Sequence, residues 1–220
     1  MNTLSITEEN YLKAIFKLSE KNNKNISTNN IAAETKTKAA SVSDMIRKLS
    51  EKKLINYEKY HGVQLTDKGK KIAIALIRKH RLWEVFLVEK LQFNWDQVHE
   101  VAEELEHVSS PLLVSRLDAF LGLPKFDPHG DPIPDEKGRI EYHEETTLDQ
   151  LKAKDKAIIV GVADQSTAFL QYLDQQKLNI KSKIEIVDHH SYDKSKTILL
   201  NGNKVFISEK VGKNIVVKRV

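Results

Sequence analysis

The sequence contains no cysteine among its 220 residues. This absence excludes disulfide bonds and metal sites built on thiolates, and it suits a reducing compartment. No apolar run approaches the roughly 20 residues that span a bilayer, so we expect no membrane partner. The first residues also lack the basic and apolar regions of a secretory signal peptide. These absences together predict a cytoplasmic protein.

Proline is scarce and unevenly placed. Only five prolines occur, and four of them lie within residues 124–134. Because proline lacks a backbone N–H and blocks regular structure, this segment predicts an ordered or extended linker. The remaining composition, 40% hydrophobic and 30% charged, is typical of a globular chain with one large or two to three small domains.

Charge is segregated along the chain, although the net charge is only +4. Residues 1–71 hold 14 basic and 8 acidic side chains, and residues 148–220 hold 13 and 8. The intervening residues 72–147 hold 8 basic and 15 acidic side chains. A basic first segment indicates a polyanionic partner, and an acidic middle indicates cations.

The acidic middle contains a stretch, residues 98–108, in which imidazoles and carboxylates recur at helical spacing. Four of them, at i, i+4, i+7 and i+8, fall within about 100° of one helix face: His99, Glu103, Glu106 and His107. No Lys or Arg lies between Asp96 and Ser109. On the preceding predicted helix, His80 and Glu84 repeat the His-x-x-x-Glu step. This convergence predicts a divalent-metal site, although a single such pair is more often a solvated helix face.

The N-terminal third combines helices with a hairpin. A capping-box pattern at Ser5 begins a first helix, and a short second helix follows. Residues 39–53 form a third helix with one apolar face, and strands 54–58 and 63–66 come next. This order predicts a winged helix-turn-helix, which is a DNA-binding motif. The alternative is a small helical domain with an incidental hairpin.

The rest of the chain changes character near residue 147. Before it, we predict helices over residues 68–91, 94–109 and 111–121. After it, short β-branched runs predict strands at 157–162, 184–187, 197–200, 204–208 and 214–220, with a helix near 169–176. Asn201-Gly202 is a strong hairpin signal, so we expect a small SH3-like β-barrel.

Three motifs in this order give the chain a family resemblance: residues 78–84, 98–108 and 130–134. The chain resembles the diphtheria toxin repressor family of metal-dependent transcriptional regulators, which includes the manganese transport regulators. The resemblance implies a mainly α fold with a small β part, in three domains. These are a winged helix-turn-helix (1–71), a helical metal-binding and dimerisation domain (72–140), and a linker with an SH3-like, FeoA-like domain (141–220).

The resemblance also implies two neighbouring metal sites. One is matched by His80, Glu84 and His99, and the other by Asn10, Glu103, Glu106 and His107. Glu103 stands where the iron-responsive branch has Cys and the manganese branch has Glu. Asn10 replaces Met or Asp of those branches, and Lys13 replaces a further acidic ligand of the manganese branch. From the SH3-like domain, Asp164 or Gln165 is a candidate ligand, and a polar turn is the alternative.

For DNA, the resemblance places residues 38–48 in the major groove as a recognition helix. Thr28, Lys38 and Ser41 would meet phosphates, Ala40 a thymine methyl group, and Ser43 and Asp44 the base edges. Asp44 could instead pair with Lys48 at i+4. The full set of expected DNA-binding residues adds Arg47 and Lys48 on the helix, and Tyr60 and His61 at the wing tip.

The resemblance implies a repressor of metal-uptake genes, and we expect no enzymatic activity. Its partners would be double-stranded operator DNA, a second copy of the chain and a divalent metal. The ligand types favour Mn²⁺ or Fe²⁺, while Zn²⁺ or Co²⁺ would also bind in vitro. Two alternatives stay open: a metal-independent DNA-binding dimer, and a di-metal carboxylate enzyme built on the Glu-x-x-His step at Glu104 and His107.

Overall fold

The structure is a computed structural model that describes residues 4–21, 26–58, 62–142 and 146–220. The chain divides into two compact units. The first comprises residues 1–80, 104–111 and 134–140, and the second comprises 81–103, 112–133 and 141–220. The division falls within one continuous helix, between His80 and Arg81.

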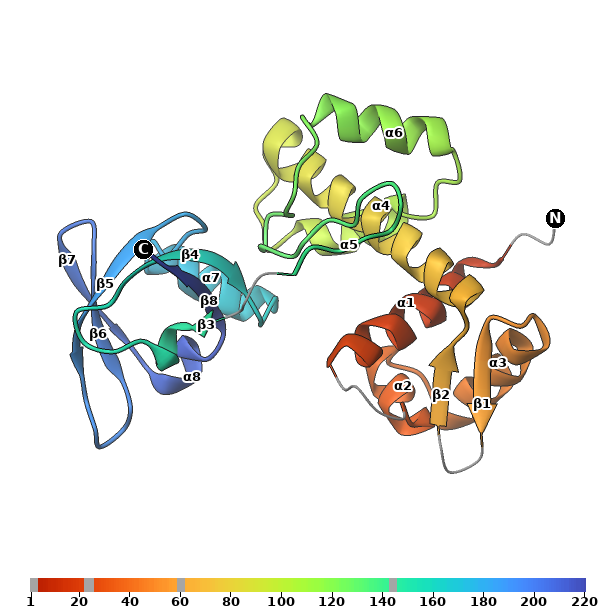
Figure 1. The fold of residues 1–220 in the computed structure, drawn as a ribbon, viewed down its shortest axis with the longest axis horizontal. Helices are drawn as coiled ribbons and strands as arrows, with labels where there is room; N and C mark the ends of the chain where they lie inside the picture. The colour runs from red at the N-terminus through yellow and green to blue at the C-terminus, as the bar shows by residue number, and fades with distance from the viewer. Residues whose placement is uncertain (1–3, 22–25, 59–61, 143–145) are drawn as a thin grey trace. The chain divides into compact units, whose positions relative to one another are not determined.

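The first unit begins with three helices and a hairpin (Figure 1). The helices are α1 (Ile6–Lys21), α2 (Thr28–Glu34) and α3 (Ala39–Glu51). Strands β1 (Ile55–Glu58) and β2 (Gly62–Leu65) pair antiparallel, and α4 (Asp67–Leu91) follows. Capping explains two of the helix starts, since Ser5 and Glu8 exchange side-chain-to-backbone hydrogen bonds and Ser27 caps α2 with Asn30. The predicted winged helix-turn-helix is confirmed.

The core of this unit is formed by the apolar faces of the helices. Leu12, Ile15, Ile31, Val42 and Leu49 are fully buried together. Burying such side chains supplies the main favourable free energy of folding, about 1.5 to 3 kcal/mol for each. The opposite face of α3 remains exposed, which leaves its polar side chains available.

The second unit contains the rest of α4, most of α5 (Val98–Leu105), and α6 (Pro111–Phe120) from its second residue. The helix predicted over residues 94–109 is shorter in the structure, so Glu106 and His107 fall in the turn after α5. The proline-rich segment is irregular but ordered. Arg81 holds it against α4 by donating to the Pro132 carbonyl and to the Asp131 carboxylate.

The C-terminal part of this unit is an antiparallel sheet with the strand order β3-β8-β4-β5-β6-β7. The strands are β3 (Thr146–Thr147), β4 (Lys156–Val162), β5 (Lys183–His189), β6 (Lys196–Leu200), β7 (Asn203–Ile207) and β8 (Ile215–Arg219). Three short helical segments accompany them: η1 (Leu148–Gln150), α7 (Thr167–Gln175) and α8 (Glu209–Gly212). Asn201 and Gly202 form the β6–β7 turn with positive φ of 49° and 82°, as type I′ hairpins require.

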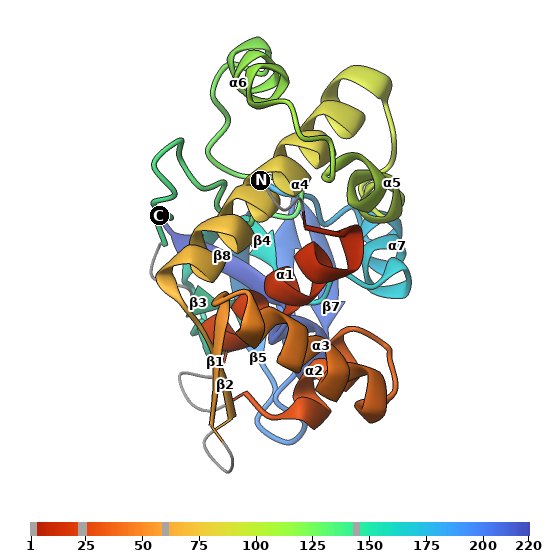
Figure 2. The same cartoon turned by 90° about the vertical axis from the view of Figure 1, so that its right-hand side faces the viewer.

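Helix α7 lies beside the segment that leads into α5 (Figure 2). Gln171 donates to Asp96, and the Trp95 indole donates to Asp174. The SH3-like sheet is therefore attached to the helical part of the second unit. Of the helices that the structure describes, none combines the length and the apolar character needed to cross a membrane.

Candidate metal centre

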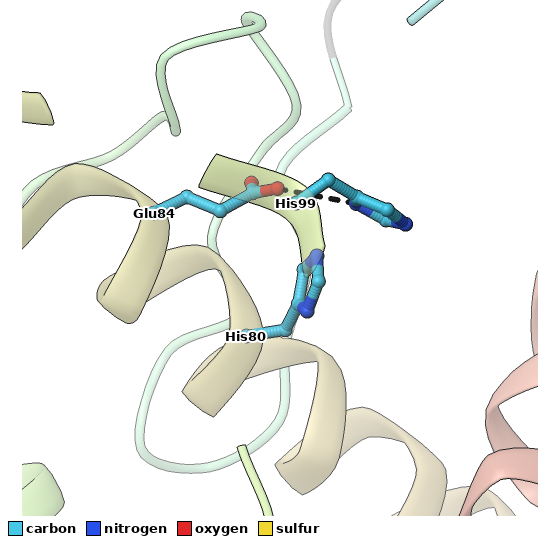
Figure 3. Close-up of side chains that lie close together, drawn as sticks. All are labelled: His80, Glu84 and His99. Atoms are coloured by element: carbon cyan, nitrogen blue, oxygen red, sulfur yellow. Dashed lines mark hydrogen bonds and ion pairs between the residues drawn. The ribbon is translucent and has the colours of Figure 1, made fainter. Parts of the chain in front are cut away.

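Helices α4 and α5 bring three predicted ligands together (Figure 3). His80 and Glu84 lie one turn apart on α4, and His99 faces Glu84 from α5, with 3.4 Å between His99 Nδ1 and Glu84 Oε1. One ligand atom from each of the three side chains lies within 4.8 Å of the others. His80 and Glu84 are buried, so this carboxylate is held away from bulk water.

A second cluster shares Glu84 and consists of Glu84, Asp127 and His129, all buried. His129 Nδ1 lies 3.6 Å from Glu84 Oε2, and His129 Nε2 lies 2.8 Å from the Trp95 carbonyl oxygen. A carbonyl only accepts hydrogen bonds, so Nε2 carries a proton there. In a neutral ring Nδ1 then offers its lone pair, which is the form that binds metals.

The prediction from sequence missed Asp127 and His129. Neither lies on a periodic element, because both belong to the irregular proline-rich segment. The segment is folded by Asp127, whose Oδ1 accepts hydrogen bonds from the backbone N–H groups of His129 and Asp131. One signal was available: a histidine placed between two aspartates within an acidic region.

Electrostatics in this cluster shift two pKa values strongly. Burial would lower the pKa of His129, but the adjacent Glu84 carboxylate raises it to about 9. Burial, with the nearby charges of Glu84 and Asp131, raises the pKa of Asp127 to about 8. The cluster therefore retains protons that a bound cation would replace.

The other predicted ligands are arranged differently. Glu103 lies beside His99, at 3.5 Å between Oε1 and Nε2. Glu106 Oε2 lies 2.6 Å from His80 Nδ1, and its Oε1 lies 2.5 Å from Lys13 Nζ. His107 Nδ1 lies 2.6 Å from Glu9 Oε2. Among the described residues, this second set does not form a compact ligand cluster.

The ionisation of Glu106 follows from these contacts. Burial would raise the pKa of Glu106, but the His80 hydrogen bond and the Lys13 charge lower it overall. Glu106 is therefore a buried carboxylate that is held ionised by its two partners. Both partners come from elements that lie far from it in the sequence, α1 and α4.

Two buried atoms without a hydrogen-bond partner are compatible with a bound cation. Asn10 Oδ1 and His129 Nδ1 are buried, and neither has a hydrogen-bond partner within the described part of the chain. An unpaired buried polar atom costs about 1 to 3 kcal/mol. Both atoms are potential metal donors, and His129 lies within a cluster of carboxylates and imidazoles. This donor set, oxygen and imidazole nitrogen without sulfur, suits Mn²⁺ and Fe²⁺.

The two candidates from the SH3-like domain are placed outside the clusters. Asp164 accepts a hydrogen bond from the Ser166 backbone N–H before α7, which is the polar turn expected as the alternative. Gln165 donates to Asp131, at 3.2 Å between Nε2 and Oδ2. Gln165 thus contacts the proline-rich segment that carries His129.

The expected DNA-reading residues lie on the exposed side of the first unit. Lys38 is the N-cap of α3, and the exposed residues of that helix include Ala40, Ser41, Ser43, Asp44, Arg47 and Lys48. Thr28 is half-buried at the start of α2. Asp44 pairs with Arg47, at 3.2 Å, and the pairing considered with Lys48 is replaced by this one. Tyr60 and His61 lie outside the described residues.

Helix α1 is attached to both ends of α3. The Tyr11 hydroxyl lies 2.9 Å from the Thr37 hydroxyl, just before α3 begins. Lys52, the C-cap of α3, donates to Glu8 at 2.6 Å. The helix that carries Asn10 thus also positions the exposed helix α3.

The chain is similar to known proteins along most of its length. Three family models match: the N-terminal DNA-binding domain of the iron dependent repressors (residues 3–63), their metal-binding and dimerisation domain (66–135), and the FeoA domain (146–219). A solved manganese-dependent transcriptional repressor in complex with manganese is 31% identical, with a TM-score of 0.85. The match covers 97% of this chain and 100% of that one. The chain belongs to the iron-dependent repressor family.

Other relatives of this repressor-family chain support the same assignment. ScaR with bound Zn²⁺ is 32% identical, with a TM-score of 0.75, over 97% of this chain and 99% of that one. The iron-dependent repressor IdeR of Mycobacterium tuberculosis is 35% identical over 134 residues, which are 61% of this chain. The chain covers only 58% of IdeR. A probable metal transport system membrane protein of Chlamydia trachomatis is 50% identical over 74 residues, and the chain covers 16% of it.

Proposed function

We propose that this repressor-family chain is a metal-dependent transcriptional repressor that binds double-stranded DNA as a homodimer and responds to Mn²⁺ or Fe²⁺. The observation that carries the proposal is the surroundings of Glu84. Two clusters of candidate ligands share this buried carboxylate, and His80, His99 and His129 converge on them. Known relatives include a manganese-dependent and an iron-dependent repressor.

The ligands fall into two proposed groups. His80, Glu84 and His99 form one, which Asp127 and His129 extend. Asn10, Glu103, Glu106 and His107 form the other. A bound divalent cation would supply positive charge next to these carboxylates and would accept the lone pairs of the imidazoles. Oxygen and imidazole donors favour Mn²⁺ or Fe²⁺, and Zn²⁺ or Co²⁺ would bind in vitro because they stand later in the Irving–Williams order.

Helix α1 is the proposed link between the metal centre and DNA. Asn10 lies on α1 between Glu8 and Tyr11, which attach to the two ends of α3. Fixing Asn10 therefore fixes the helix that positions α3. Lys38 and the exposed polar face of α3 would enter the major groove, with phosphate contacts setting the register and Ser43 and Asp44 reading bases.

The homodimer is proposed from the exposed apolar side chains on and after α6. Leu112, Leu113, Phe120 and Leu123 are 40 to 68% exposed. Large apolar side chains exposed on one short helix and the turn after it indicate an interface, and the matching family model is a metal-binding and dimerisation domain. A two-fold dimer would require a palindromic operator. We propose metal-uptake genes as the targets.

The di-metal enzyme receives no support from the geometry. Glu104, which its Glu-x-x-His step requires, is exposed and lies outside both ligand clusters of the described residues. Such an enzyme needs a second Glu-x-x-His step. The other one in the sequence runs from Glu58 to His61, and His61 lies outside the described part of the chain.

DNA binding with and without metal tests the proposal. Duplexes are selected from a random library with Mn²⁺ present, and their affinity is then measured with Mn²⁺, with Fe²⁺ and with chelator. Metal must shift the equilibrium from the state that cannot bind DNA toward the state that can. To change the ratio of competent to incompetent protein from 1:99 to 99:1, it must bind the competent state more favourably by about 5.5 kcal/mol. We expect the wild type to bind DNA tightly with Mn²⁺ or Fe²⁺ and weakly with chelator. The His80→Ala variant should bind DNA weakly in all three conditions. Equal affinity in all three conditions would contradict the proposal.

A further inference from the structure

A lysine ammonium lies among the proposed ligands of the second group. Lys13 Nζ is 2.5 Å from Glu106 Oε1, and both side chains are almost fully buried, at 7% and 0% exposed. Lysine is seldom buried unless it is paired. Because His80 Nδ1 lies 2.6 Å from Oε2, both oxygens of Glu106 already have a partner.

The register of α1 explains how Lys13 reaches this position. Asn10 and Lys13 are three residues apart, so they share one face of the helix. That face carries Asn10 Oδ1, which has no hydrogen-bond partner among the described residues, and the Lys13 ammonium one turn further along. The Lys13 ammonium neutralises the Glu106 carboxylate, which would be a ligand of a metal bound beside Asn10.

A buried carboxylate needs a compensating positive charge, and a tethered or a free cation can provide it. In this chain Lys13 provides it from within the protein. A lysine ammonium sits on a flexible four-carbon stem, so it can leave Glu106 without movement of the α1 backbone. Any divalent cation that takes Glu106 as a ligand must share it with Lys13 or displace Lys13.

We propose that Lys13 is a built-in competitor for the metal at Glu106, and that it thereby sets the metal concentration at which this site fills. The inference rests on the proposed function, because it takes Glu106 as a metal ligand. It assigns to Lys13 a role that lowers affinity. An ion pair that served stability alone would leave metal affinity unchanged or reduced when broken.

Metal titrations of the full chain test this role with Mn²⁺ alone as the probe. Lys13→Met removes the charge, and Lys13→Gln removes the charge while keeping a hydrogen-bond donor for Glu106. Lys71→Met is the matched control, because it removes the same charge from an exposed position on α4. Each variant is also made with Glu106→Gln added. The difference between the two titrations gives the Mn²⁺ binding that depends on Glu106, apart from binding at the cluster around Glu84.

We expect Lys13→Met and Lys13→Gln to bind Mn²⁺ about tenfold more tightly or better, since a like charge is removed from beside the cation. The Mn²⁺-induced rise in melting temperature should grow correspondingly. Lys71→Met should match the wild type, and the gain should vanish when Glu106→Gln is added. If Lys13→Met fails to fold, the titration of Lys13→Gln decides.

Two failures are distinguishable. If Glu106→Gln in the wild-type background leaves Mn²⁺ binding unchanged, Glu106 is not a ligand and the proposed metal centre is wrong at this position. If wild-type binding depends on Glu106 but the folded Lys13 variants bind no more tightly, the metal centre stands and the competitor role of Lys13 is overturned.

Discussion

At the residue scale, Glu84 and His129 are the most informative pair. Glu84 belongs to both ligand clusters, and its charge raises the pKa of His129 to about 9. Neutral imidazole is the metal-binding form, so a cation at this cluster must release a proton at neutral pH. Metal affinity there should therefore increase as the pH rises toward 9.

The stability of the metal-free protein should decrease over the same pH range. In the folded chain the pKa of His129 is about 9, against an ordinary value of 6.5, and that of Asp127 is about 8, against 3.8. Both pKa values are raised in the folded state. Between the ordinary pKa and the raised pKa of each group, the folded state therefore binds more protons than the unfolded state. The stabilisation from His129 is complete below pH 6.5 and is lost as the pH rises through 9.

Thermal melting of chelated protein checks this dependence. We expect a lower melting temperature at pH 9 than at pH 6, and His129→Gln should flatten part of the curve. His190→Gln changes an exposed histidine of the SH3-like part and is the control. A melting temperature that rises from pH 6 to pH 9 would show that His129 is not held protonated by Glu84.

At this scale the sequence predicts residues on regular elements well. Helical periodicity places His80 and Glu84 one turn apart on α4, and the family resemblance groups them with His99 of α5, which lies beside them in the structure. Asp127 and His129 could not be found in that way, because side-chain-to-backbone hydrogen bonds fold their segment. The partners of Glu106 were also beyond reach, since they depend on long-range packing between α1, α4 and the turn after α5.

At the element scale, the proline-rich segment connects the His129 cluster to the SH3-like sheet. Gly130 has φ +92°, and a Cβ there would lie 2.2 Å from the Val160 carbonyl oxygen of β4. The His129 carbonyl also accepts a hydrogen bond from the Val162 backbone N–H. The segment therefore contacts β4 through its backbone, and only glycine allows that approach.

Gly130→Ala should loosen this contact and disturb His129. We expect a loss of about 1 kcal/mol from the positive φ and about 1 to 3 kcal/mol more from the collision with β4. Trp95 stacks on His129, with ring centroids 6.1 Å apart, so its fluorescence reports the change. Gly122→Ala is the matched control, because Gly122 also has positive φ (+77°) but a Cβ there meets nothing within 4 Å. Equal losses in the two variants would contradict the argument.

Tyr11→Phe should weaken the link between α1 and α3 without touching a proposed ligand. It removes the hydroxyl that lies 2.9 Å from Thr37, which costs about 1 kcal/mol. We expect unchanged Mn²⁺ affinity but a smaller difference in DNA affinity between the metal-bound and metal-free protein. Tyr172→Phe removes a hydroxyl from the SH3-like part and is the control. If Tyr11→Phe shows the same difference in DNA affinity between the metal-bound and metal-free protein as the wild type, this hydrogen bond does not connect the metal centre to α3.

The ends of elements were harder to predict than their existence. All the predicted strands after residue 147 are present, but the helix expected over residues 94–109 spans only Val98–Leu105. At its start, Trp95 and Asp96 contact α7, and Asn94 accepts a hydrogen bond from the Gln97 backbone N–H in a turn. At its end, Glu106 and His107 contact α4 and α1. These tertiary contacts, which periodicity cannot reveal, shorten the helix.

At the scale of the whole molecule, assembly is expected to depend on α6. Leu112 and Phe120 are 68% and 65% exposed, and Lys90 lies over the Phe120 ring. We expect Phe120→Glu to give a monomer in analytical ultracentrifugation, because a charge placed in an apolar interface is left desolvated. DNA affinity should fall with it.

The control for this prediction is a change of the same kind elsewhere on the surface. Tyr192 in the SH3-like part is fully exposed, so Tyr192→Glu adds the same charge at an exposed aromatic position. It should leave the oligomeric state unchanged. If Phe120→Glu sediments like the wild type, the dimer does not form through α6.

Asn10 Oδ1, which is buried without a hydrogen-bond partner among the described residues, has a consequence for the lifetime of the protein in the cell. A ligand that binds only the folded state raises its stability in proportion to the logarithm of its concentration, and a bound metal would give Asn10 Oδ1 a partner. We therefore expect the metal-starved protein to open more often and to be cleaved faster by proteases. The abundance of the chain would then follow the metal supply, so that scarcity removes the protein as well as silencing it.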